Sequence, residues 1–302
     1  MCDVSIIIVN YHVVHLIADC IDSIIRHTKG ISYEIIVVDN NSQPEMKEFL
    51  YQRLDNKTPE SLKVVNLPEN IGFGRANNEG FKIAQGDKIF FLNPDTILLN
   101  NAVKILSDFL DNHKEVGACG GNIYDQFGQP TFSFWRVFPG LYYDLDALFK
   151  YIPTKLIYGP NLHHNFTRKP CEVAYIIGAD LMTRRHILKE TGGFSPEFFM
   201  FFEESDLCRR IRRLGYKIFS VPEAKIIHLE SKTFEKNSFP GEKRVILSEN
   251  SRNIYLQRNF GKAARLLSNS VYWFFLKTRV LLLQDKNKKE YFRLRLKHFR
   301  FK

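Results

Sequence analysis

Cysteine is scarce and scattered in this chain, with five in 302 residues. None of the five stands in a CxxC pair or at the Cys/His spacing of a structural zinc site. This pattern argues against a zinc-binding fold and favours reduced thiols in a cytoplasmic setting.

Glycine-rich nucleotide motifs and export signals are also missing. Neither the GxxxxGK[ST] pattern of P-loop ATPases nor the GxGxxG pattern of dinucleotide-binding enzymes occurs, so both classes lack their signatures. The first apolar run, residues 4–9, has no basic leader and is too short for a signal peptide. It fits a buried strand better.

Net charge is absent from residues 1–261 and concentrated in residues 262–302. In that tail 12 lysine and arginine residues accompany 2 acidic residues, which accounts for the formal net charge of +10. Two apolar runs, Val271–Leu276 and Val280–Leu283, lie among the cations. They are too short to span a bilayer. The mixture fits a helix on the inner, anionic surface of the cytoplasmic membrane, or equally a helix packed on protein, and no nucleic acid is expected.

Short apolar runs alternate with helical patterns through the first half of the chain. This alternation predicts an α/β fold with a mostly parallel sheet and helices on both faces. We expect strands at 4–9, 33–38, 62–66, 88–92, 116–122, 173–177, 217–221 and 224–227, and helices at 13–27, 45–54, 72–85, 102–112, 184–191 and 205–214. Residues 123–172 fit loops or a flap. The prediction is one domain over residues 1–235 and a basic, helical extension over 236–302.

Polar residues follow four of the expected strands directly. They are Asn10-Tyr11-His12, residues 39–42, residues 70–78 and Asn93-Pro94-Asp95. Ligands of open α/β sheets bind beyond the carboxyl ends of the strands, so we expect one shared ligand site there. Asp95 and His228, which ends the last expected strand, are suitable ligands for Mg²⁺ or Mn²⁺. Residues 70–78 resemble a glycine-rich turn into a helix N-terminus that suits a diphosphate.

A run of aromatic residues leads into three carboxylates between Phe199 and Asp206. One interpretation is a charged first helical turn, since acids are favoured at helix N-termini. The other is a pocket in which a carboxylate with a raised pKa takes up a proton. The residues of this segment alone fit both.

The order of these motifs resembles family 2 glycosyltransferases, and most closely the bacterial rhamnosyltransferase-like branch. The resemblance covers residues 3–230 and includes SIIIVNY from Ser5, NIGFGRANN from Asn70, FLNPD ending at Asp95 and FEESDLCRR from Phe202. It implies a GT-A fold, a nucleotide-diphosphate sugar donor and inversion at the anomeric carbon.

The resemblance also implies roles for individual residues. Asp39 matches the acid that holds the nucleoside, and Asp95 and His228 match metal-binding positions, although Asn93 stands where the family has a first aspartate. Glu204 matches the catalytic base, as a Glu where Asp is usual, which leaves Asp206 as the alternative base. The other residues expected to bind the donor are Tyr11, Asn41, Asn70, Gly72, Arg75, Asn77 and Asn93.

The function implied is transfer of rhamnose or another hexose to a hydroxyl of a glycan or lipid-linked acceptor in bacterial surface polysaccharide synthesis. A sugar-1-phosphate nucleotidyltransferase is one alternative, but it would carry a glycine-rich basic turn where residues 10–13 read NYHV. A non-catalytic, membrane-associated partner with a sugar-nucleotide fold is the other. The intact acids at Asp95, Glu204 and Asp206 speak against it.

Overall fold

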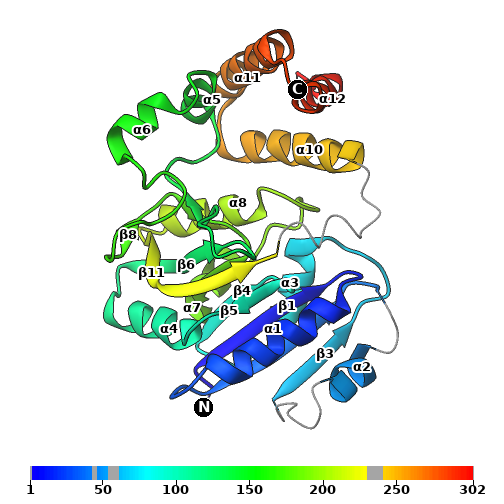
Figure 1. Ribbon diagram of the computed structural model, residues 1–302, viewed down its shortest axis with the longest axis vertical. Helices are drawn as coiled ribbons and strands as arrows, with labels where there is room; N and C mark the ends of the chain where they lie inside the picture. Colours follow the sequence, from blue (N-terminus) through cyan, green and yellow to red (C-terminus); the bar gives the residue numbers. More distant parts are fainter. Residues whose placement is uncertain (1, 43–45, 54–60, 230–240, 302) are drawn as a thin grey trace.

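The computed structural model describes residues 2–42, 46–53, 61–229 and 241–301. Within them a nine-stranded sheet has the order β3-β2-β1-β4-β10-β6-β11-β5, with β8 paired to β11 (Figure 1). Its strands are β1 (Val4–Asn10), β2 (Tyr33–Asp39), β3 (Leu62–Asn66), β4 (Lys88–Leu92), β5 (Thr96–Leu98), β6 (Val116–Tyr124), β8 (Cys171–Glu172), β10 (Asp180–Arg184) and β11 (Lys217–His228). A small antiparallel pair, β7 (Phe134–Trp135) and β9 (Tyr175–Ile176), lies beside it.

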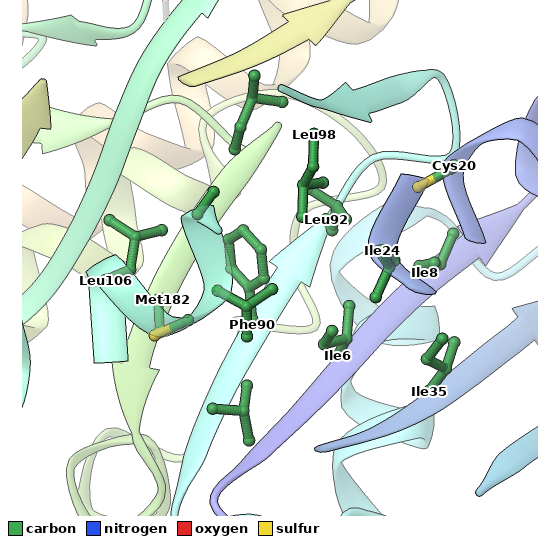
Figure 2. Close-up of a cluster of buried hydrophobic side chains, with 14 of the residues drawn as sticks. Ile6, Ile8, Cys20, Ile24, Ile35, Phe90, Leu92, Leu98, Leu106 and Met182 are labelled. Atoms are coloured by element: carbon green, nitrogen blue, oxygen red, sulfur yellow. The ribbon is translucent and has the colours of Figure 1, made fainter. Parts of the chain in front are cut away.

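Helices cover both faces of the sheet. Successive residues of β1 point to opposite sides, so each face carries apolar side chains that a helical layer buries. Ile6 and Ile8 pack with α1 (Val14–His27) and α4 (Ala102–Asn112) in the cluster shown in Figure 2. Ile7 and Val9 face the other side, which is covered by α3 (Phe73–Ile83), α7 (Arg185–Thr191) and α8 (Glu203–Arg213). Each such buried side chain contributes about 1.5–3 kcal/mol. A short α2 (Met46–Arg53) follows β2.

The predicted parallel sheet is confirmed for its first four strands. β3, β2, β1 and β4 are mutually parallel, and the register places Asn10 opposite Asp39 and Asp39 opposite Asn66. The carboxyl ends of these strands therefore meet at one edge. The polar residues after them lie at that edge, as expected.

The strand prediction was wrong in the middle of the chain. The central strand is β10, antiparallel between β4 and β6, whereas the expected strand at 173–177 is reduced to the two residues of β9. β10 has polar ends, Asp180 and Arg184, which are buried because they bind backbone of β6 and α4. β5 was not expected, and the two strands expected at 217–221 and 224–227 form one strand, β11, with a register shift between Ser220 and Lys225.

Residues 123–172 are also more regular than predicted. They include α5 (Leu141–Leu148) and α6 (Ile152–Tyr158), which gather with the C-terminal helices at the end of the molecule far from the N-terminus (Figure 1). The expected helical extension is present as α10 (Gly241–Asn259), α11 (Lys262–Leu282) and α12 (Lys286–His298). The predicted domain boundary at 235/236 lies outside the described residues.

Two contacts hold this helical end together and to the sheet domain. Phe198 is buried in one cluster with Tyr255 and Leu256 of α10. Asp144 of α5 forms a buried ion pair with Arg252 of α10, at 2.7 Å. Among the helices that the structure describes, none is both long and apolar enough to cross a membrane.

Candidate active site

The ends of β1 and β2 fix one carboxylate in place. Asn10 Nδ2 donates to Asp39 Oδ1 at 2.7 Å, and the backbone N–H of Ser42 donates to Asp39 Oδ2 at 3.1 Å. Asp39 is therefore buried and oriented at the sheet edge. Tyr11 and Asn41 lie beside it and are more exposed; the Tyr11 ring contacts the His12 ring at 4.5 Å. This cluster can receive a ligand that presents hydroxyl donors.

The segment after β3 is tied to the protein by its amides. Asn40 Nδ2 donates to Asn70 Oδ1 at 2.8 Å, and the N–H of Ile71 donates to Asn40 Oδ1 at 2.9 Å. A Cβ at Gly72, where φ is +89°, would overlap the carbonyl oxygen of Phe199. Asn70 thus joins the loop after β3 to the end of β2, and Gly72 lies against the segment that carries the acids. Asn40 was not singled out from the sequence, although it stands within the polar run after β2.

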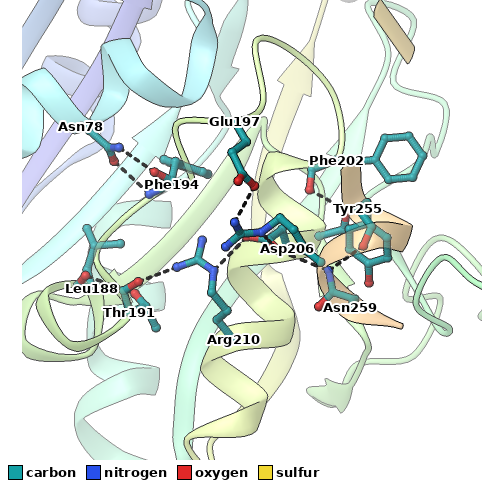
Figure 3. A network of polar contacts seen from close by, with 12 residues as sticks. Asn78, Leu188, Thr191, Phe194, Glu197, Phe202, Asp206, Arg210, Tyr255 and Asn259 are labelled. Atoms are coloured by element: carbon teal, nitrogen blue, oxygen red, sulfur yellow. Dashed lines mark hydrogen bonds and ion pairs between the residues drawn. The ribbon is translucent and has the colours of Figure 1, made fainter. Parts of the chain in front are cut away.

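Two residues expected to bind the donor form hydrogen bonds with the protein backbone. Asn77 is buried in α3 and donates to the carbonyl of Phe73 at 3.1 Å. Arg75 Nε donates to the carbonyl of Pro196 at 2.6 Å. Their neighbour Asn78 forms two bonds with the backbone of Phe194, at 2.7 and 2.9 Å (Figure 3). These bonds fix α3 against the chain that enters α8.

Asp95 and His228 are brought together by the antiparallel pairing of β5 and β11. Thr96 is opposite His228 in the register, which places His228 Nε2 3.2 Å from Asp95 Oδ1. Asn93 Nδ2 lies 3.2 Å from the same imidazole nitrogen. Asn93 Oδ1 is buried and has no hydrogen-bond partner within the described part of the chain.

This donor set suits a hard divalent cation. A carboxylate and an imidazole, with a free amide oxygen nearby, leave positions for substrate phosphates, as Mg²⁺ and Mn²⁺ require. A group of three or more His, Cys, Asp or Glu side chains arranged for a metal is not found among the described residues. The residues therefore fit a cation that shares its coordination with a bound substrate.

The acids follow two residues in the left-handed region. Phe201 and Phe202 have φ values of 71° and 68°, a conformation that costs a non-glycine residue about 1–2 kcal/mol. Helix α10 supports this turn, because Ser251 Oγ donates to the carbonyl of Met200 at 2.7 Å and Tyr255 contacts the Phe202 ring at 5.6 Å. These contacts hold the strained turn, and with it the start of α8, against α10.

Glu203 and Glu204 open α8 and share a poorly solvated site. Glu203 is buried beneath Gly74, and burial together with the nearby Glu204 charge holds its pKa well above the usual range. Burial raises the pKa of Glu204 to about 7, while the N–H groups at the helix start oppose this rise. Glu204 is the more accessible of the two. A carboxyl of this kind can exchange a proton near neutral pH.

Asp206 is occupied by other side chains. Arg210 Nε donates to Asp206 Oδ2 at 2.8 Å, Asn259 Nδ2 donates to Oδ1 at 3.3 Å, and Arg258 Nε lies 3.5 Å from Oδ1 (Figure 3). Asp206 is buried among these partners. It joins α8 to α10.

The backbone of Gly178 and Ala179 connects the Asp95–His228 pair to Glu204. The N–H of Asn93 donates to the carbonyl of Ala179 at 3.0 Å. A Cβ at Gly178 would lie 3.9 Å from the Cβ of Glu204, in ordinary contact. The two groups therefore flank one short segment.

The chain matches the model of Glycosyl transferase family 2 over residues 5–192. It belongs to this family. The match includes the ends of β1, β2 and β4 and stops before Glu204, so the acid pair lies outside the matched residues.

Curated relatives include two rhamnosyltransferases. The chain is 22% identical to the dTDP-rhamnosyl transferase RfbF of Shigella flexneri over 278 residues, which covers 90% of this chain and 86% of RfbF. It is 24% identical to the N-acetylglucosaminyl-diphospho-decaprenol L-rhamnosyltransferase of Mycobacterium tuberculosis, over 64% of this chain and 66% of that protein. It spans only 12% of a further relative, the teichoic acid biosynthesis protein GgaB of Bacillus subtilis.

A solved structure of GalNAc-T7 with UDP, GalNAc and Mn²⁺ has a similar fold. The TM-score is 0.64 at 15% sequence identity, and the similarity covers 99% of this chain and 54% of GalNAc-T7. The expected GT-A fold is confirmed.

Proposed function

We propose that this family 2 glycosyltransferase moves a hexose, such as rhamnose, from a nucleotide-diphosphate donor to a hydroxyl of a glycan or lipid-linked acceptor, with inversion. The observation that carries the proposal is Glu204, whose pKa is raised to about 7 and which lies beside Gly178, in the segment whose Ala179 carbonyl accepts from Asn93 near the Asp95–His228 pair. Relatives named for dTDP-rhamnose and for a diphospho-decaprenol acceptor support this substrate class. The relative named for teichoic acid biosynthesis, GgaB, supports a role in bacterial surface polysaccharide synthesis.

The donor is proposed to bind along the carboxyl ends of β1, β2 and β4. The oriented carboxylate of Asp39 would accept hydrogen bonds from the nucleoside, and the Tyr11 ring would lie against its base. Asn41 adds an exposed amide at the same edge. Asn70, Gly72, Arg75 and Asn77 are assigned to shaping the loop, since each contacts protein groups.

Glu204 is proposed as the general base of a single displacement. Its carboxylate takes the proton from the acceptor hydroxyl, and the acceptor oxygen forms a bond to the anomeric carbon. The bond from that carbon to the donor phosphate oxygen breaks, and its electron pair leaves with the nucleotide diphosphate. Attack from the face opposite the leaving group inverts the anomeric configuration.

Asp95 and His228 would hold a divalent cation, with Asn93 beside them. When bound, such a cation supplies charge neutralisation for the diphosphate. The fit of the donor set and the Mn²⁺ in the GalNAc-T7 structure support this assignment.

The deciding experiment compares Glu204→Gln with Asp206→Asn in a sugar-transfer assay. Glu204→Gln should lower kcat by about a hundredfold or more, because a proton acceptor is lost while the shape is kept. Asp206→Asn should chiefly lower stability, because the carboxylate binds Arg210 of α8 and also Arg258 and Asn259 of α10. Near-full activity of Glu204→Gln would show that the base is another residue. A stable but inactive Asp206→Asn would transfer the role to Asp206.

A second experiment tests the cation and identifies the donor. Thermal stability is measured with a panel of UDP- and dTDP-sugars, with and without Mn²⁺, and a donor at 100 times its Kd should add about 2.7 kcal/mol. EDTA should abolish both transfer and the Mn²⁺-dependent part of the stabilisation. Transfer that continues unchanged in EDTA would contradict the cation assignment.

We also propose that the protein works at the inner surface of the cytoplasmic membrane. The concentration of the net charge of +10 in residues 262–302 supports this, because cations near an anionic leaflet each gain about 1 kcal/mol.

A further inference from the structure

Helix α11 is turned so that its polar side faces the protein. Ser268 and Asn269 are buried, and Arg252 of α10 donates to Asn269 Oδ1 at 2.7 Å and to Ser268 Oγ at 3.2 Å. Tyr272, one turn further along, is buried and donates to Glu249 of α10 at 2.8 Å. The inner face of α11 therefore supplies hydrogen-bond partners for the buried charges of Arg252 and Glu249.

Leu276 is also buried on the inner face, but several other apolar side chains of α11 face outward. Trp273 and Phe274 are 38% and 53% exposed, and Leu281 and Leu282 are 75% and 79% exposed. Residues 273 and 274 and residue 281 lie two turns apart and share one face of the helix. Large apolar side chains gathered on an exposed face mark an interaction surface.

Helix α6 adds a second apolar group at the same end of the molecule. Leu156 is 82% exposed and Ile157 is 67% exposed. α6 follows α5, and α5 packs on α11, where Arg279 donates to the carbonyl of Ala147 at 3.1 Å. Figure 1 shows α5, α6 and α11 together, on the side away from the N-terminus and the first strands.

Cations accompany both apolar groups. Lys155 is exposed on α6, and Lys277 is exposed on α11 with its Nζ 5.3 Å from the Trp273 ring centre. Lys286 and Lys288 follow at the exposed start of α12. A second copy of this chain would bring like charges together here. An anionic surface with an apolar interior complements both features.

We propose that the outer faces of α6 and α11 form one lipid-binding surface that rests on an anionic bilayer. We call Leu156, Ile157, Trp273, Phe274, Leu281 and Leu282 the lipid-facing residues. Their side chains would enter the boundary between headgroups and acyl chains, while the flanking lysines meet phosphate groups. The inference rests on the proposed location at the membrane surface. It extends that proposal to α6, which lies outside the basic tail.

The test is sedimentation of the full-length protein with lipid vesicles. Vesicles of equal parts phosphatidylglycerol and phosphatidylcholine should bind the protein, and vesicles of phosphatidylcholine alone should bind it much less. Leu281→Glu/Leu282→Glu and Leu156→Glu/Ile157→Glu should each weaken binding by at least about tenfold, because apolar contacts are replaced by charges that anionic lipid repels. Leu99→Glu, at an exposed position after β5, is the matched control and should bind like the wild type.

The outcomes separate this proposal from the proposed chemistry. No binding of the wild type to anionic vesicles, or unchanged binding of both double variants, would overturn it. Light scattering that shows a dimer lost in Leu281→Glu/Leu282→Glu, with vesicle binding kept, would instead assign the surface to a second copy. Transfer to a soluble acceptor without vesicles should be unchanged in both variants. If the wild type transfers no sugar, or if Glu204→Gln alone loses transfer, the result concerns the proposed transfer reaction. It does not change the test of this surface.

Discussion

The adjacent carboxyls of Glu203 and Glu204 differ in their surroundings. Glu203 lies under Gly74 in the protein interior, whereas Glu204 lies beside Gly178 and is more accessible. Two carboxyls in one poorly solvated site do not ionise together easily, so their pKa values move apart. The buried Glu203 is the one held well above the usual range, which leaves Glu204 with a pKa of about 7. The difference supports the proposed role of Glu204 as the general base.

The first prediction concerns the pH dependence of sugar transfer. Because a general base must be deprotonated, kcat should rise with pH through about 7 and level off above it. Below that pH it should fall about tenfold per pH unit. The measurement is kcat between pH 5 and 9, with the exposed Glu223→Gln as a control that keeps the wild-type profile. A flat profile down to pH 5 would contradict the assignment of Glu204.

The second prediction concerns Gly72. Its backbone is left-handed, and a Cβ there would overlap the Phe199 carbonyl, so Gly72→Ala should lower the free energy of unfolding by about 2–4 kcal/mol. Gly128 is the matched control, because its φ is also positive, at +75°, but nothing lies within 4 Å of its Cβ position. Gly128→Ala should cost only about 1 kcal/mol. Urea unfolding measures both, and equal losses would show that the contact with Phe199 is unimportant.

Helix α10 contributes directly to the turn before the acids. Its Ser251 hydroxyl binds the Met200 carbonyl, its Tyr255 ring contacts Phe202, and its Asn259 binds Asp206. The strained pair Phe201–Phe202 is thus held from outside the residues that match the family model. The C-terminal helices are part of the site's support.

The third prediction follows from this support. Ser251→Ala should lower kcat severalfold with little change in KM, because the turn that places Glu204 loosens. It should also cost about 1 kcal/mol of stability. Ser270→Ala on α11 is the control, since Ser270 makes a comparable bond to a backbone carbonyl at 3.0 Å on an exposed surface. Equal kinetics for the two variants would contradict the supporting role of α10.

The fourth prediction concerns the joint between α5 and α10. Asp144→Ala leaves Arg252 buried without its ion pair, which should cost about 3–5 kcal/mol. Asp22→Ala removes an exposed i,i+4 pair with Arg26 and should cost at most about 1 kcal/mol. Chemical unfolding distinguishes the two. A small loss for Asp144→Ala would mean that the helical end is held chiefly by apolar contacts.

The sequence predicted those elements whose signals are local. β1 to β4 were predicted because each is a short apolar run, and the polar residues after them marked the ligand edge. β10 was missed because Asp180 and Arg184 are polar and become buried only through partners on β6 and α4. α5 was missed because Asp144 reads as a surface residue until Arg252, far away in the chain, is placed beside it.

The site was predictable to a similar degree. Asp39, Asp95 and Glu204 were selected from motifs, and the structure places them at the expected edge or beside it. Asp95 and His228 were expected to serve one metal site, but the β5–β11 pairing that brings them together was not predicted, because β5 is too short to recognise from its residues. The sequence favoured Glu204 as the base but left Asp206 as an alternative, because two of the partners of Asp206, Arg258 and Asn259, are long-range contacts on α10.

At the scale of the whole molecule, the two parts of the chain share buried contacts. Phe198 precedes the acids and is buried with Tyr255 and Leu256, and Asp206 is bound by Asn259. Separation of the C-terminal helices would expose these groups. The division at residue 235 remains a prediction about the chain, and the contacts favour a single folding unit.

The fifth prediction tests this with the two tryptophans. Trp135 lies in β7 and Trp273 lies in α11, so Trp273→Phe and Trp135→Phe each leave one fluorescent reporter. Both reporters and the far-ultraviolet circular dichroism should give the same urea midpoint, as expected of a cooperative unit. A lower midpoint reported by Trp273 alone would show that the extension unfolds independently.

The register shift in β11 has a consequence for how such a site can change. His228 pairs with Thr96 of β5, and it lies in the part of β11 that follows the register shift against β6 between Ser220 and Lys225. Adding or removing one residue there would turn the imidazole to the opposite face of the strand without altering Asp95 or Asn93. Dependence on the proposed cation could therefore be gained or lost through the insertion or deletion of one residue. Comparisons of relatives should align this register shift before they compare the histidine.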